Sequence, residues 1–433
     1  MLKHLTICNV GPATRPDLEF GERLNLITGD NGVGKTFLLD ACWYALTRTW
    51  ADNQPFYPPA NAQKEHPPEI QHTVIGRSGK PSEGIARYQF SGQEWKGEAK
   101  RPVMPGLVIY ARIDGGFSVW DPARNYWRDE VTGRDRPSAY QFTKAELWDG
   151  LQTDTAEGKK TICNGLLRDV ENWRLRGNGA FARLQSVLRR LSADDQEVLA
   201  IGEAVRVRVD DVRDIPTLRM PYGPVPVTQA AAGMKRVLAL AYLLVWAWEE
   251  HLRAAALQQE EPENRIVVLF DEVEAHLHPK WQRVFLPALL DVVSTLLIQT
   301  EAKSVQFITT THAPLVLASV EPVFDEDRDA LFNIEVTGEH RVQIVPRRWA
   351  MQGDASKWLV SESFGLKQAR SKEAQDAIEA AEAWMRGERD SLPEGLRTAA
   401  EIDGRLGQVL AGHDRFWPRW IVRSGQHEGE AGR

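Results

Sequence analysis

Three short apolar runs form the most regular part of the hydrophobic pattern. They cover residues 24–28, 265–270 and 305–311, and polar residues or glycine bound each of them. Short apolar runs between such boundaries are typical of buried strands. They predict an α/β fold whose sheet contains these three segments.

A longer apolar run at 237–248 predicts a buried helix. It holds about a dozen residues between charged pairs, which is too short to span a bilayer. The N-terminus begins a strand rather than a charged segment followed by a long apolar core, which argues against a signal peptide. Neither pattern predicts membrane contact.

Further helical spacing appears at residues 163–191, 371–386 and 396–410.

The order of these patterns predicts four parts. Residues 1–50 and 221–345 form a split core, and residues 51–220 form an inserted α+β lobe with both strand and helix patterns. Residues 346–423 form a helical C-terminal region, and the polar stretch 424–433 is expected to be a disordered tail. No heptad pattern persists over several turns, so long coiled-coil arms are not expected.

The composition is that of a globular protein with reduced thiols. The chain has 433 residues, more than one ordinary hydrophobic core, with 42% hydrophobic and 26% charged residues. Its net charge of −7 argues against a uniformly basic surface that coats nucleic acid. Cys8, Cys42 and Cys163 form no C-x-x-C pair, which indicates a cytoplasmic protein without a zinc hook.

The first candidate for chemistry follows the strand predicted at 24–28. The residues after it match G-x-x-x-x-G-K-[ST], the pattern of a phosphate-binding loop. Glycines let backbone N–H groups turn inward on a phosphate, and the following helix adds the positive end of its dipole. The lysine is expected to contact the β and γ phosphates of ATP, and the threonine hydroxyl to bind Mg²⁺. The predicted nucleotide contacts are Gly29, Asp30, Asn31, Gly32, Val33, Gly34, Lys35 and Thr36.

Two acidic residues end the strand predicted at 265–270. Asp271 is placed to bind the Mg²⁺ directly or through water, and Glu272 to orient and deprotonate an attacking water. The strand at 305–311 ends at His312, which is placed to hydrogen-bond the γ-phosphate or that water. Together with the phosphate loop, the acidic pair indicates a hydrolase rather than a nucleotide carrier.

The order of these motifs resembles the RecF/SMC/Rad50 branch of ABC-type ATPases. The residues that carry the resemblance are the phosphate loop, 271–279 (DEVEAHLHP) and 311–314 (THAP). The chain is especially similar to the bacterial overcoming-lysogenization-defect-like and Septu-type ATPases of anti-phage systems. The resemblance implies an ABC-type P-loop ATPase core in which residues 274–279 touch the opposing subunit and His312 is the switch histidine.

ATPases of this kind carry a signature loop, usually a serine and a glycine at the start of a helix, that grips the γ-phosphate bound to the other subunit. Here Gly233 matches the glycine, while Ala231 stands at the serine position. Backbone N–H groups and the helix dipole are then left to bind the phosphate. The resemblance therefore implies a homodimer or higher homo-oligomer formed through shared ATP sites, with slow hydrolysis.

The glutamine that contacts Mg²⁺ in the Q-loop of such ATPases has no clean match. The candidates for its role are Gln89, Gln141 and Asp114. For Asp114, the competing interpretation is a plain β-hairpin with surface charges.

Two further features also leave alternatives open. The basic stretch 168–190, with Trp173 and Phe181, fits a nucleic-acid groove or, better, a solvated helix face with acidic neighbours. The aromatic cluster 416–420 fits a tail docked on the ATPase core or a partner-binding patch.

No nuclease site accompanies the ATPase motifs. Asp325 and Asp327, the acidic candidates beyond His312, follow no buried strand, and no metal-ligand spacing is present. We therefore expect an ATP- and Mg²⁺-dependent ATPase whose nucleotide-dependent dimerisation controls a partner, such as a co-encoded nuclease, in anti-phage defence. The alternatives are a RecF-like DNA-binding ATPase of DNA repair and, third, a transporter ATPase subunit.

Overall fold

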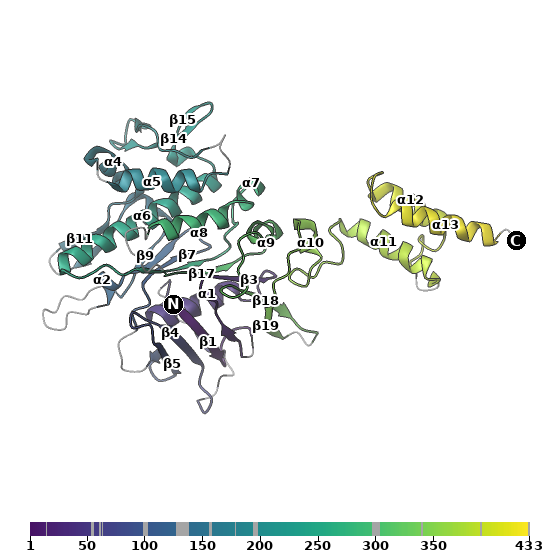
Figure 1. Cartoon of the computed structure of the whole chain (residues 1–433), viewed down its shortest axis with the longest axis horizontal. Coiled ribbons are helices and arrows are strands. Elements are labelled where there is room, and N and C mark those ends of the chain that lie inside the picture. The colour runs from purple at the N-terminus through teal and green to yellow at the C-terminus, as the bar shows by residue number, and fades with distance from the viewer. Residues whose placement is uncertain are drawn as a thin grey trace. The chain divides into compact units, whose positions relative to one another are not determined.

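In a computed structural model the chain forms two compact units, residues 1–355 and 356–433 (Figure 1). The first unit combines sheets and helices, and the second is built from helices. The structure describes residues 1–13, 15–52, 56–59, 62, 64–97, 103–126, 138–155, 158–177, 179–193, 198–296, 304–338, 341–389 and 392–431.

An eight-stranded sheet is the central element of the first unit. Its order is β19-β18-β3-β17-β16-β7-β8-β9. The five strands from β18 to β7 run parallel, and antiparallel strands flank them at both edges. The three strands predicted from apolar runs are confirmed as β3, β16 and β17, and they lie side by side. The bounds are β3 (Leu24–Gly29), β7 (Leu107–Ala111), β8 (Phe117–Trp120), β9 (Tyr140–Phe142), β16 (Arg265–Phe270), β17 (Ser304–Thr310), β18 (Ala330–Val336) and β19 (Val342–Arg347).

A second, antiparallel sheet has the order β2-β1-β4-β5-β6. Segment 51–220, predicted as one inserted lobe, supplies strands to both sheets, because β4 to β6 lie in this sheet and β7 to β9 in the larger one. The bounds are β1 (Leu2–Cys8), β2 (Asp17–Glu19), β4 (Glu69–Ile75), β5 (Pro81–Gln89) and β6 (Glu94–Gly97). Three hairpins complete the strands: β10 (Leu151–Thr155) with β11 (Gly158–Cys163), β12 (Val205–Arg206) with β13 (Asp214–Ile215), and β14 (Thr217–Met220) with β15 (Gly223–Pro226).

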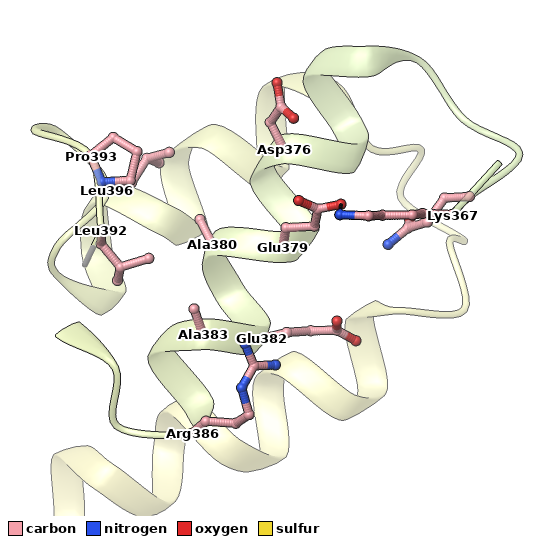
Figure 2. A pocket seen from close by; sticks show the side chains of 11 residues that line it. Lys367, Asp376, Glu379, Ala380, Glu382, Ala383, Arg386, Leu392, Pro393 and Leu396 are labelled. Atoms are coloured by element: carbon pink, nitrogen blue, oxygen red, sulfur yellow. Dashed lines mark ion pairs between the residues drawn. The ribbon is translucent and has the colours of Figure 1, made fainter. Parts of the chain in front are cut away.

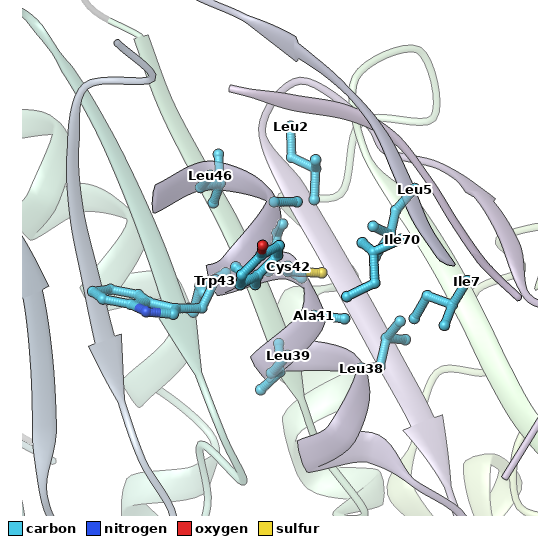
Figure 3. Close-up of a cluster of buried hydrophobic side chains, with 14 of the residues drawn as sticks. Leu2, Leu5, Ile7, Leu38, Leu39, Ala41, Cys42, Trp43, Leu46 and Ile70 are labelled. Carbon is cyan, nitrogen blue, oxygen red and sulfur yellow. The ribbon is translucent and has the colours of Figure 1, made fainter. Parts of the chain in front are cut away.

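Helix α1 (Lys35–Thr47) lies between the two sheets and contacts strands of both. Figure 3 shows its apolar side chains, among them Leu38 and Cys42, beside Leu5 and Ile70 of the smaller sheet. Burial of each leucine in such a core contributes about 1.5–3 kcal/mol. This core fixes the helix that follows the phosphate loop.

The other helices of the first unit include α6 (Ala232–Gln258), which contacts α5, α8 and β7. The predicted buried helix 237–248 is its central part. The pattern at 163–191 forms two helices, because Gly177 adopts a left-handed conformation and ends the first of them. The remaining bounds are α2 (Pro122–Asn125), α3 (Lys144–Asp149), α4 (Leu166–Arg176), α5 (Gly179–Arg190), η1 (Val227–Gln229), α7 (Pro279–Gln282), α8 (Phe285–Leu296) and α9 (Pro314–Val320). Helix α10 (Ala355–Leu359) starts at the last residue of this unit, and its other residues belong to the C-terminal unit.

The C-terminal unit contains α11 (Lys372–Met385), α12 (Ala399–Val409) and α13 (Trp417–Ala431). Ser371 and Thr398 cap the first two helices through hydrogen bonds to backbone N–H groups. Phe416 and Trp420 pack inside this unit, so the aromatic cluster builds a core of its own. α13 continues to Ala431, so most of the stretch predicted as a disordered tail is helical in the structure.

Within the described parts of the chain, every helix is too short or too polar to span a lipid bilayer.

A buried histidine gives a test of the smaller sheet. His72 of β4 is 4% exposed, and burial together with the nearby Arg48 lowers its pKa to about 3. Because this pKa is below that of the unfolded chain, the unfolded state binds a proton more readily, and stability is lost as the pH falls from 6.5 toward 3. His72→Leu has no group that titrates here, so its free energy of unfolding should fall less steeply with decreasing pH. We expect the difference from the wild type to be up to about 1.4 kcal/mol per pH unit.

Urea denaturation at about pH 5 and pH 7 measures the effect. His66→Leu is the control, since that side chain is exposed. The prediction would be contradicted if the free energy of unfolding changed by the same amount between the two pH values in the wild type and in His72→Leu.

Candidate functional site

Four neighbouring parallel strands of the larger sheet end at the same edge, and the candidate residues follow them. β3 leads into the phosphate loop, β17 to His312, β16 to Asp271 and Glu272, and β7 to Asp114. The carboxyl ends of parallel strands are where open α/β sheets bind ligands. The structure thus brings together the motifs that the sequence carries far apart.

The phosphate loop is wound around the side chain of its own lysine. Gly29, Gly32 and Gly34 have φ angles of 148°, 79° and 101°, which glycine adopts at low cost. Lys35 is 5% exposed, and its Nζ donates to the carbonyl oxygens of Gly29 and Asp30, both at 2.9 Å. An ammonium group held on backbone carbonyls can exchange them for phosphate oxygens, which form stronger, charge-assisted hydrogen bonds.

The two residues predicted to bind Mg²⁺ are in direct contact. Thr36 Oγ1 donates to Asp271 Oδ2 at 2.6 Å, and Thr310 Oγ1 donates to the other oxygen, Oδ1, at 2.6 Å. A hydroxyl and a carboxylate are oxygen ligands of the kind that Mg²⁺ binds, so this pair fits the metal.

Asp40 lies one turn further along α1, and the sequence did not identify it as a candidate residue. Its pKa is raised to about 7, mainly by burial.

The turn after β16 is held on both sides. Glu272 has a φ of 48°, a left-handed conformation that costs a non-glycine residue about 1 kcal/mol or more. Its N–H donates to Thr310 Oγ1 at 2.7 Å. Arg236 of α6 donates to the carbonyl oxygens of Asp271 and Glu272 at 3.0 and 3.1 Å. The sequence interpretation gave Arg236 no role beyond flanking the buried helix.

His312 lies closer to Glu274 than to Glu272. Its Nδ1 lies 3.0 Å from Glu274 Oε1 and 3.6 Å from Glu272 Oε1. The hydrogen bond to Glu274 raises the pKa of His312. In the sequence, Glu274 was expected only as part of the loop that touches an opposing subunit. The one local feature that could have identified it is its position as an acidic residue two places after Glu272.

The start of α6 packs closely on the loop 274–279. Ala231 is the N-cap and makes no side-chain capping hydrogen bond. A Cβ atom on Gly233 would lie 2.7 Å from the carbonyl oxygen of His276. Gly233 is therefore required for this close approach of two backbone segments. This packing role is independent of any contact between Gly233 and a nucleotide.

Of the three Q-loop candidates, Asp114 follows β7, one of the four parallel strands that end at the candidate site. It lines a cavity of about 150 Å³ together with Arg236 and His276. Gln141 lies on β9, where its amide donates to the carbonyl oxygen of Trp50 at 2.9 Å. Gln89 ends β5 in the smaller sheet.

The basic stretch 168–190 is largely engaged within the unit. Trp173 is buried, with its ring centroid 5.5 Å from that of Tyr242. Three arginines of the stretch form ion pairs: Arg174 with Glu171, Arg183 with Glu249, and Arg190 with Asp291. These contacts favour the helix-face interpretation.

Asp325 and Asp327 lie in a turn after α9, where the N–H of Asp327 donates to Asp325 Oδ1 at 3.1 Å. Among the residues that the structure describes, no group of three or more histidine, cysteine or acidic side chains is arranged to hold a metal.

The C-terminal unit carries a larger, open cavity of about 770 Å³ on one side of α11 (Figure 2). Its floor is apolar, with Ala380 and Leu392, and charged side chains surround it. These charges are compensated by ion pairs, for example Lys367 with Glu379 at 3.1 Å. The cavity therefore offers no uncompensated charge to a ligand.

Two protein families and one full-length relative match large parts of this chain. Residues 4–161 match the family described as "AAA domain", and residues 168–318 match "AAA domain, putative AbiEii toxin, Type IV TA system". Septu protein PtuA of Bacillus thuringiensis is 21% identical over 396 residues, which cover 87% of each chain.

Two retron proteins are also similar over shorter stretches. Retron Vc95 probable ATPase of Vibrio cholerae serotype O1 biovar El Tor is 26% identical over 145 residues, which is 29% of this chain and 25% of that protein. Retron Ec83 probable ATPase of Escherichia coli is 38% identical over 55 residues, 13% of this chain and 8% of that protein. The chain thus matches only a minor part of the length of these two relatives.

Among solved structures, the SMC head domain from Thermotoga maritima gives a TM-score of 0.39 at 14% identity, over 80% of this chain and 99% of that one. A structure of the recombination mediator protein RecF gives 0.37 at 14% identity, over 80% and 98% of the two chains.

The close approach at Gly233 predicts a cost for any side chain there. We expect Gly233→Ala to lower the free energy of unfolding of the first unit by about 1–3 kcal/mol, because the added methyl group meets a backbone carbonyl. Gly179→Ala, at the start of α5, is the matched control and is expected to be neutral or stabilising, because no described residue beyond its local backbone comes within 4 Å of its Cβ position. Chemical denaturation compares the two, and wild-type stability for Gly233→Ala would refute the packing argument.

Proposed function

We propose that this chain, an AAA/ABC-type ATPase related to the Septu and retron proteins, binds and hydrolyses ATP with Mg²⁺, and that its nucleotide-dependent dimerisation controls a partner protein. The observation that carries the proposal is the contact of Thr36 with Asp271 beside Lys35 and Glu272. The similarity to Septu protein PtuA supports a role in anti-phage defence. A co-encoded nuclease is the partner class we propose, acting in the same cell compartment.

The residues at the strand ends have separate tasks. Lys35 binds the β and γ phosphates after leaving the carbonyls of Gly29 and Asp30. Thr36 and Asp271 hold Mg²⁺, which when bound neutralises charge that develops on the phosphate oxygens. Glu272 accepts the proton of the attacking water, and its strained, doubly held turn keeps the carboxylate at a fixed position.

Dimerisation follows from the position of α6. Its N-terminus and the loop 274–279 lie together. The resemblance to RecF/SMC/Rad50-type ATPases supports the proposal that both face the nucleotide of an opposing subunit. With Ala231 as N-cap, the free backbone N–H groups of the first turn bind the γ-phosphate without a hydroxyl. This arrangement supports association driven by ATP and slow turnover.

The acid–base role of Glu272 is tested by Glu272→Gln. We expect turnover to fall at least about a hundredfold while ATP still binds, because a carboxamide cannot accept the proton of water. Lys35→Ala is expected to lose nucleotide binding itself, and Lys3→Ala, an exposed lysine of β1, to lose neither. Steady-state phosphate release and equilibrium binding of a fluorescent ATP analogue measure the two properties; undiminished turnover in Glu272→Gln would exclude it as the base.

The shared ATP site is tested at Ala231. In a Glu272→Gln background with ATP and Mg²⁺, we expect the dimeric or higher-order fraction to rise. Ala231→Asp should reverse this, because its carboxylate would face phosphate, while aspartate remains a good N-cap and does not weaken α6. Ala231→Ser restores a hydroxyl and should strengthen association.

Light scattering after size exclusion, in a concentration range where monomer is detectable, gives the mass. The same mass with and without ATP would contradict the shared-site proposal.

A further inference from the structure

Glu274 binds His312 at two points through one carboxylate oxygen. Its Oε1 accepts the backbone N–H of His312 at 2.7 Å and lies 3.0 Å from the ring nitrogen Nδ1. Glu272 Oε1 lies 3.6 Å from the same nitrogen, which is too long for a hydrogen bond. The histidine is therefore bonded to Glu274 and leaves the Glu272 carboxylate free.

Glu274 is buried, and its backbone is hydrogen-bonded within the loop 274–279. Glu274 is 4% exposed, and its carbonyl oxygen accepts the N–H of Leu277 at 2.8 Å. Its other carboxylate oxygen, Oε2, has no hydrogen-bond partner among the described residues. Two contacts of the Glu274 side chain are thus made with His312.

This contact also sets the direction of the ring. Nδ1 and Nε2 lie on different sides of an imidazole, so a bond from Nδ1 to Glu274 turns Nε2 away from that glutamate. The His312 side chain is 45% exposed, so the ring has one side held in the protein and one side open.

The electrostatics of the two groups agree with an ion pair. The hydrogen bond to Glu274 is the largest cause that raises the pKa of His312; Glu272 adds to it, while burial and Lys35 oppose it. Burial alone would raise the pKa of Glu274, but hydrogen bonds from the ring and backbone of His312, together with those from the Glu274 backbone and Thr311, outweigh it, and the pKa is lowered. Each group thus favours the charged form of the other.

We propose that Glu274 is the positioning residue of His312, which it holds with Nε2 directed to the γ-phosphate position while Glu272 stays free to act on water. The role of His312 toward phosphate rests on the proposed function. Glu274 itself touches no reacting atom and acts through the ring, as outer partners that orient a metal-binding histidine do.

A double-mutant cycle tests this coupling. Glu274→Gln keeps the shape of the side chain and removes its charge, and we expect kcat to fall about tenfold or more while KM for ATP changes less than about twofold. If Glu274 acts through the ring, Glu274→Gln in a His312→Ala background should slow turnover no further. Reductions that multiply in the double variant would overturn the proposal.

A spectroscopic measurement addresses the contact independently of turnover. NMR of protein labelled with ¹⁵N-histidine gives the ring titration of His312, identified as the signal lost in His312→Ala. We expect its pKa to fall in Glu274→Gln. Glu321→Gln is the matched control, because Glu321 is also buried and accepts a backbone N–H, that of Gln352 at 2.8 Å.

An unchanged His312 titration in Glu274→Gln would overturn the positioning role. A wild-type protein that hydrolyses no ATP would defeat the proposed function, and the ring titration would still decide whether Glu274 holds His312.

Discussion

A carboxylate removed from water needs compensation for its negative charge. Asp271 is such a group, directly after the end of β16, and its exposure is 0%. Its two oxygens accept hydrogen bonds from Thr36 and Thr310, which come from α1 and β17. Loss of either donor would leave a buried charge without its partner, a more costly change than loss of an exposed pair. The phosphate loop, β16 and β17 are thereby held in one arrangement.

The register of the strands positions Thr310 for its hydrogen bond to Asp271. Phe270 pairs with Thr309, and Thr310 pairs with Ile27, so Thr310 lies beside both β16 and β3. A slip of one residue would turn its hydroxyl to the opposite face of the sheet. On the other side, the smaller sheet packs on α1 and fixes the helix that carries Thr36 (Figure 3). The antiparallel sheet thus contributes to the site without supplying a residue to it.

The parts of this structure that the sequence predicts are those governed by local patterns. Apolar runs identify β3, β16, β17 and the middle of α6, and glycine spacing identifies the phosphate loop. Contacts between distant segments leave no such pattern. No periodicity indicates that Arg236 reaches the carbonyls of Asp271 and Glu272, or that His312 bonds to Glu274. For the same reason, segment 51–220 looks like a separate insertion in sequence, although its strands complete both sheets.

Helix α6 contacts both the loop 274–279 and the turn that carries Glu272. Its first turn contains Gly233, whose backbone lies against the carbonyl of His276, and one turn later Arg236 donates to the backbone of Glu272. A helix moves as a rigid body over so short a distance, since its backbone hydrogen bonds connect successive turns. Displacement of the first turn would therefore also move the donor that holds Glu272 at its left-handed φ of 48°. The first turn of α6, which we propose presents N–H groups to an opposing nucleotide, thus also bears on the position of Glu272, the carboxylate that we propose acts on water.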